Sequence, residues 1–70
     1  MTLENVLSAI SGGTKIVIHA HMKEIFRGCM ADVSDEGPMS KEDWYRIVGP
    51  YLREEVYRIN TVDGFITLAV

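Results

Sequence analysis

The chain has almost nothing that would fix its fold covalently. Among its 70 residues there is a single cysteine, Cys29, so an internal disulfide is excluded. A domain of this size buries only about 60% of the surface that its unfolded chain exposes, so its core is small. Small domains without disulfides often gain stability from a partner chain. The missing disulfide therefore points towards stabilisation by a partner.

Positive charge is also scarce. Seven lysine and arginine residues stand against ten acidic ones, which gives a net charge of −3. The basic residues are scattered, whereas binding that depends on neutralising phosphates needs them clustered. We expect no direct contact with nucleic acid, and a charged partner should present a basic surface.

Long apolar runs are absent as well. No run approaches the roughly 20 residues that a membrane-spanning helix needs. The stretch from Met1 to Asn5 lacks the basic start and the apolar core of a signal peptide. These features predict a cytoplasmic protein that does not bind membranes.

The familiar catalytic motifs are missing too. The sequence has no glycine-rich phosphate loop, no dinucleotide fingerprint and no Ser-His-Asp set. We therefore expect a protein that is not an enzyme and that carries no cofactor.

The chain does have the pattern of two short amphipathic helices. The first has apolar residues at i, i+3, i+4 and i+7, namely Leu3, Val6, Leu7 and Ile10. Thr2 is its expected N-cap, and a Gly-Gly pair follows it. The second helix is predicted from about residue 41 to 48, with Ser40 as its cap and Trp44 on its buried side. We expect Trp44 to lie in the core.

Four stretches have the alternation or the β-branched composition of strands. They are residues 15–22, 25–33, 55–60 and 65–70. The pair Asp63-Gly64 is a strong turn signal before the last stretch, whereas the reversal near Lys23-Glu24 has no such chemistry. We predict one α+β domain over residues 1–70 with the order α-β-β-α-β-β. Its antiparallel sheet should consist of two hairpins, with the two short helices on one face.

The last strand is unusually apolar. From Phe65 to Val70 it carries no charge and no proline, so it lacks the residues that normally blunt an exposed sheet edge. Either it lies in the middle of the sheet or it pairs with a second chain. The small core favours the second solution, so we expect a homodimer that forms through Phe65 to Val70.

Two histidines could take part in metal binding. His19 and His21 lie two residues apart on a predicted strand, so both rings should project from one face. Cys29 is the obvious third ligand, but the expected pairing sets it opposite Ile18, on the other face. The same residues could serve cysteine chemistry, with Cys29 as nucleophile and a histidine as base. Two solvated histidines and a small buried cysteine are the commoner explanation of such a pattern.

Acidic and aromatic residues are candidates for protein recognition. Asp35 and Glu36 lie in a loop, and Glu42 begins the second predicted helix. Loop solvation explains these charges, and so does an acidic patch that recognises a basic protein surface. Tyr45 lies off the apolar side of the helix, so we expect it to be exposed and available for contact.

The chain resembles small uncharacterised proteins encoded by Firmicutes and their prophages. The resemblance rests on short segments, namely Leu3 to Ile10, Thr14 to Ile18, Ile25 to Gly28, Glu55 to Ile59 and Asp63 to Ile66. It implies an α+β fold and no activity. The leading hypothesis is a non-enzymatic protein-interaction module, such as a phage or mobile-element accessory protein that modulates a host protein. Anti-CRISPR-like inhibition belongs to this class. The alternative is a metal-binding or catalytic domain built on His19, His21 and Cys29.

Overall fold

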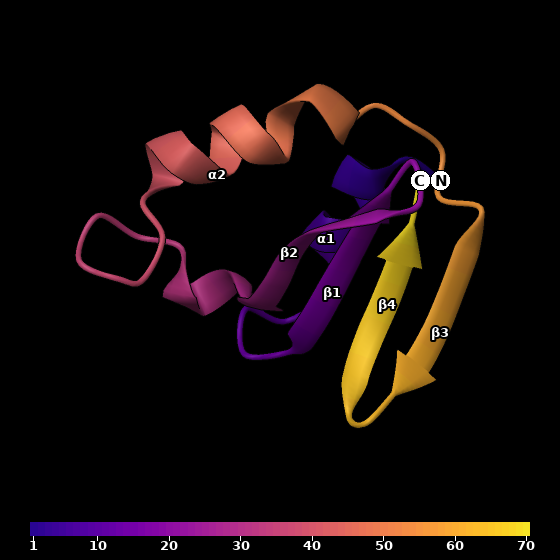
Figure 1. The fold of residues 1–70 in the computed structure, drawn as a ribbon. Helices are drawn as coiled ribbons and strands as arrows, with labels where there is room; N and C mark the ends of the chain where they lie inside the picture. Colours follow the sequence, from indigo (N-terminus) through magenta and orange to yellow (C-terminus); the bar gives the residue numbers. More distant parts are fainter.

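A computed structural model describes residues 1–70, and its elements follow the predicted order (Figure 1). Each predicted helix and strand has a counterpart, and two short 3-10 turns, η1 and η2, flank the second helix. The elements are α1 (Leu3–Ala9), β1 (Lys15–Ala20), β2 (Lys23–Cys29), η1 (Met30–Asp32), α2 (Lys41–Ile47), η2 (Gly49–Tyr51), β3 (Arg58–Val62) and β4 (Phe65–Ala69). The α+β class is confirmed.

The sheet differs from the prediction in how the two hairpins meet. Its strand order is β2-β1-β4-β3, and the hairpins β1–β2 and β3–β4 are antiparallel as expected. β1 and β4, however, pair in parallel, with Ile18 opposite Leu68. The sheet is therefore mixed, and the prediction of a wholly antiparallel sheet is wrong. Each hairpin can be recognised from local sequence, but the direction in which two hairpins join depends on the crossover between them.

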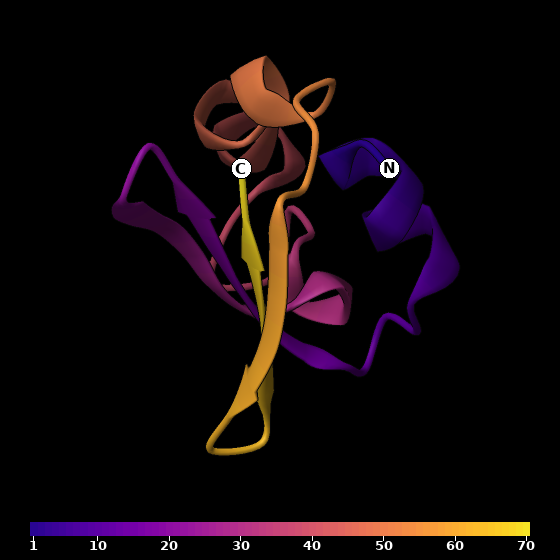
Figure 2. The same cartoon turned by 90° about the vertical axis from the view of Figure 1, so that its right-hand side faces the viewer.

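Both helices pack on one face of this sheet. Alternate residues of the central strands, among them Ile16, Ile18 and Leu68, are fully buried on that face. Leu3 of α1 and Trp44 of α2 join the same cluster, and Trp44 is only 5% exposed, which confirms the prediction for it. In Figure 2 the sheet is seen nearly edge-on, with α1 on one side of it. The opposite face has no helix over it.

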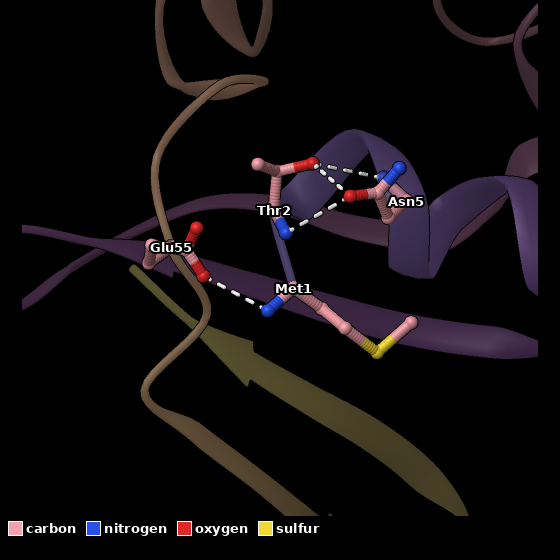
Figure 3. A network of polar contacts seen from close by, with 4 residues as sticks. All are labelled: Met1, Thr2, Asn5 and Glu55. Atoms are coloured by element: carbon pink, nitrogen blue, oxygen red, sulfur yellow. Dashed lines mark hydrogen bonds and ion pairs between the residues drawn. The ribbon is translucent and has the colours of Figure 1, made fainter.

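Local capping explains where the helices begin. Thr2 accepts a hydrogen bond from the backbone N–H of Asn5, and the Asn5 side chain accepts one from the Thr2 N–H, which completes a capping box (Figure 3). Beside it the amino group of Met1 donates to Glu55 at 2.8 Å. The backbone bond from Leu3 N–H to the Glu54 carbonyl, 2.9 Å long, ties the start of α1 to the segment before β3. The Ser40 side chain caps α2 by accepting from the Asp43 N–H at 3.1 Å, without the reciprocal bond found at α1.

One of the two hairpin turns lies at different residues than predicted. The first hairpin reverses at His21 and Met22, with φ angles of 53° and 69°, and not at Lys23-Glu24. Positive φ is uncommon for residues other than glycine, and neither histidine nor methionine is a typical turn residue, so the pair carries no turn signal. The second hairpin uses the predicted Asp63-Gly64 pair as a two-residue turn, so β3 runs on to Val62.

The strand from Phe65 to Val70 is not at the margin of the sheet. β4 pairs with β1 on one side and with β3 on the other, so the open edge on which the dimer prediction depended is absent. A strand that is apolar on both faces takes the central place, where its backbone is paired on both sides. The exposed edges belong to β2 and β3. Among the helices, none combines the length and the hydropathy that a membrane crossing requires.

Candidate functional site

The two histidines do not converge. His19 is half-buried on the helix-free face, with its Nε2 3.9 Å from a Glu24 carboxylate oxygen. β1 ends at Ala20, so His21 lies in the turn, and the prediction that both rings share a strand face is wrong for His21. The His21 ring lies 5.6 Å from the ring of Tyr51, and its Nε2 lies 3.3 Å from the Glu54 carboxylate. Each histidine therefore has its own carboxylate partner.

Cys29 lies at the far end of the first hairpin from both histidines. It is opposite Lys15, not Ile18, because the strands pair in a different register from the one predicted. Its thiol donates a hydrogen bond of 3.5 Å to the carbonyl of Gly13. No three histidine, cysteine, aspartate or glutamate side chains come together as a set that could hold a metal ion. Metal binding by His19 and His21 stays a prediction, and the structure brings no third ligand close to them.

A β-bulge organises the helix-free face near His19. Ile18 pairs with Phe26 and His19 with Glu24, so Ile25 is an extra residue in β2. In a regular strand, residues three apart point to opposite faces. The bulge instead brings Glu24 and Arg27 onto the same face, where two hydrogen bonds of 2.7 and 3.3 Å join them.

This ion pair is the main electrostatic feature of the face. The Arg27 hydrogen bond and its charge hold the pKa of Glu24 below its ordinary value, with a smaller contribution from His19. The Arg27 guanidinium in turn lies 5.2 Å from the centre of the Phe65 ring. Next to it is a shallow hollow of about 480 Å³, lined by side chains of β1, β2 and the second hairpin. The face is thus a polar network over apolar side chains, with both partners of the ion pair exposed to solvent.

On the other side of the molecule, α2 presents the predicted recognition residues. Tyr45 is 60% exposed, as expected, and its ring lies 5.2 Å from that of Trp44 at an interplanar angle of 85°. Glu42 is exposed in the first turn of α2. Asp35 and Glu36 are exposed in the loop that leads into this helix. This loop projects away from the sheet in Figure 1.

The acidic loop is held by a close backbone approach. Gly37 donates to the carbonyl of Ser34 at 3.0 Å, and Ser34 donates to the carbonyl of Met39 at 3.0 Å. A Cβ at Gly37 would lie 2.3 Å from the carbonyl oxygen of Asp32, so only glycine fits there. The loop therefore has a defined shape, and none of Asp35, Glu36 and Glu42 belongs to an ion pair within the chain.

Sequence reasoning missed two features. The Glu24–Arg27 pair depends on the bulge at Ile25, and no residue type in β2 signals a bulge at that position. The exposed edge of β3 was missed because β4 was expected at the margin. Residues 58–62 read as a strand from their sequence, but only the strand order shows that this strand lies at the margin of the sheet.

Comparison with known proteins gives no further guidance, since no family model, curated protein or solved structure matches this chain.

Proposed function

We propose that the chain is a non-enzymatic protein-interaction module that binds a basic surface of a partner protein. The observation that carries this proposal is the exposed Tyr45, packed edge-on against the buried Trp44. Its helix and the loop before it also carry exposed acidic residues that form no ion pair within the chain, although Lys41 lines the same hollow as Tyr45. We call Tyr45, Asp35, Glu36 and Glu42 the acidic recognition surface.

The arrangement suits an interface hot spot. An aromatic ring supplies a large contact area at a low cost in conformational entropy. The edge-on contact with Trp44 restricts the Tyr45 ring before a partner arrives, which lowers that cost further. The carboxylates of the acidic recognition surface would steer a basic partner and orient it. They fit this role because none is neutralised within the chain.

The prophage setting is itself part of the proposal and rests on the short segments in which the chain resembles such proteins. A cytoplasmic phage or mobile-element accessory protein would use such a surface to modulate a host protein. A basic nucleic-acid channel of a host nuclease, the target of anti-CRISPR-like inhibitors, is one partner class with the required charge. The overall charge of −3 is compatible with it.

Affinity capture with matched variants tests the proposal. The immobilised protein is exposed to a lysate of its source cells, beside Tyr45→Ala and Glu42→Lys and the control Tyr57→Ala, which removes an equally exposed tyrosine elsewhere. We expect a retained protein that is lost with Tyr45→Ala, weakened with Glu42→Lys and kept with Tyr57→Ala. Thermal melts establish that all four proteins are folded. Equal retention by the wild type and Tyr45→Ala would overturn the proposal.

A further inference from the structure

The outer edge of β3 is open along its whole length. All five residues of β3 are exposed, and the strand pairs only with β4. Figure 2 looks onto this side of the molecule and shows β3 in front, with no other element over it. Ile59 and Val62 are 59% and 52% exposed, one on each face of the sheet. Arg58 is the only charged residue on β3, and within Arg58–Val62 the edge has neither a proline nor a lysine nor a bulge.

The hairpin turn fixes which backbone groups face outward. A two-residue turn makes its flanking residues, Val62 and Phe65, a hydrogen-bonded pair. Because such pairs alternate along an antiparallel ladder, Asn60 also bonds to β4. The N–H and C=O groups of Ile59 and Thr61 then point away from β4, towards solvent.

We propose that a second copy of this chain pairs with this edge, β3 against β3, about a two-fold axis at Asn60. In this antiparallel register Ile59 lies opposite the partner's Thr61, and Thr61 opposite the partner's Ile59. Every outward N–H and C=O of these two residues then finds a partner. An axis centred on Ile59 or on Thr61 would leave half of them unpaired. The sheet would continue through the axis from one copy into the other.

The side chains fit the same register. Arg58 lies opposite the partner's Val62 and next to the partner's Asp63. Arg58 has no ion pair within its own chain, and Asp63 faces the same hollow as Arg27 without forming an ion pair with it. The two Arg58 side chains stay about 14 Å apart along the strand, so like charges do not meet. At the axis the Asn60 amides face each other, and each amide can both donate and accept. On the helix side Ile59 is covered by the partner's Thr61. Charge and hydrogen bonding therefore both favour a second copy as the occupant.

Nuclear magnetic resonance at high protein concentration tests the pairing directly. Within one chain the Hα atoms of Arg58 and Val62 are about 14 Å apart, too far for a nuclear Overhauser effect. In the proposed dimer they face each other in a non-hydrogen-bonded pair, so we expect a cross-peak between them. The amides of Ile59 and Thr61 should also exchange more slowly as concentration rises. Absence of the cross-peak with fast, concentration-independent exchange at both amides would overturn the proposal.

Cross-linking tests the register. In a Cys29→Ser background, Asn60→Cys should form an interchain disulfide under mild oxidation, because the two sulfur atoms meet at the axis. Thr61→Cys is the matched control, since it lies opposite the partner's Ile59. Preferential cross-linking of Asn60→Cys supports the register, and equal cross-linking of both overturns it.

Sedimentation tests the association itself. The wild type should move from 7.9 kDa towards twice that mass as concentration rises. Asn60→Lys places like charges at the axis and should weaken dimerisation about fivefold or more. Ala9→Lys adds the same charge to the exposed end of α1 and should not. A wild type that stays at 7.9 kDa overturns the proposal, and the acidic recognition surface is unaffected because it lies on other elements.

Discussion

The two hairpins of this sheet are stabilised in opposite ways. In the first, Ile16, Val17 and Ile18 of β1 are all buried, and Phe26 of β2 lies 6.5 Å from the Trp44 ring in an edge-on contact. In the second, no residue of β3 is buried. The turns show the reverse, since the first hairpin bends at two non-glycine residues with positive φ and the second at Asp63-Gly64. Tertiary packing therefore stabilises both strands of the first hairpin but only β4 of the second, where Leu68 and Ala69 are buried, so the outer strand β3 depends on its pairing with β4 and on the Asp63-Gly64 turn.

The same contrast appears at the two margins of the sheet. β2 carries Lys23, Glu24 and Arg27 and a bulge at Ile25, which are the usual means of preventing edge-to-edge pairing. β3 has only Arg58 as a charged residue and keeps a regular ladder. One edge is protected and the other is available, and association should be confined to the available one.

Truncating the core residue above the first hairpin should have the largest effect. Trp44→Ala should cost about 3–5 kcal/mol of unfolding free energy, the range for large buried aromatic residues. In a domain of this size, with a total stability of about 5 kcal/mol, the variant should be largely unfolded at 25 °C. Chemical denaturation followed by circular dichroism measures this. A midpoint denaturant concentration within a few tenths molar of the wild type, or a melting temperature within a few degrees of it, would contradict the assignment of Trp44 to the core.

Two further variants locate the effect. Phe65→Ala truncates a half-buried ring of the second hairpin and should cost less than half as much as Trp44→Ala. Trp44→Phe keeps a ring but removes the Nε1 donor, which is buried and has no acceptor within the chain. Because an unsatisfied buried donor is itself costly, this variant should lose much less stability than its decrease in volume suggests.

The turn of the second hairpin should be sensitive to the backbone alone. Gly64 has φ = 82°, and a Cβ there would meet nothing within 4 Å. Gly64→Ala should therefore cost about 1–2 kcal/mol through backbone strain without a steric clash. Gly13→Ala is the matched control, since its Cβ is equally free and its φ is not in the positive range. Equal melting temperatures for the two variants would show that the turn does not stabilise this hairpin.

The turn of the first hairpin should respond in the opposite direction. Met22 has φ = 69° and is 94% exposed. Its left-handed backbone is therefore strained, and its side chain makes no packing contact that would offset the strain. Met22→Gly should raise stability by about 0.5–1 kcal/mol, since the strain relieved exceeds the entropy of the added glycine. Ser8→Gly, on the exposed side of α1, should lower it by a similar amount. Thermal melts of both variants decide the matter, and a destabilised Met22→Gly would mean that the His21-Met22 turn is unstrained.

These contrasts explain which parts of the fold could be predicted from sequence. Helix α1 has both an apolar periodicity and a cap at Thr2, and Asp63-Gly64 is an unambiguous turn signal, so both were placed correctly. The His21-Met22 turn could not be found, because neither residue type favours positive φ enough to be recognised. The parallel pairing of β1 with β4 was missed since it depends on where α2 directs the chain.

The candidate site shows the same limit. The exposure of Tyr45 and the burial of Trp44 follow from their positions on one helix, and both were predicted. The separation of His19 from His21 depends on where β1 ends. The position of Cys29 depends on the register of the first hairpin. Both are set by the bulge and the turn, which the alternation of residues does not encode.

The smallest expected effect concerns the ion pair that the bulge creates on the protected edge. Arg27 lowers the pKa of Glu24 in the folded protein, first through its hydrogen bonds and then through its charge. Arg27→Gln should bring the pKa of Glu24 back towards its ordinary value, as followed by the side-chain resonances in a pH titration. Because the folded-state pKa is lowered, the stabilisation from this pair is present above the unfolded-state pKa, and it is lost as the pH falls through the folded-state pKa. Wild type and Arg27→Gln should thus differ slightly in melting temperature at neutral pH and converge under acid conditions.

Arg46→Gln breaks the comparable pair with Asp43 in α2 and should leave the Glu24 titration unchanged. Identical Glu24 titrations in wild type and Arg27→Gln would mean that the bulge does not hold the two side chains together in solution.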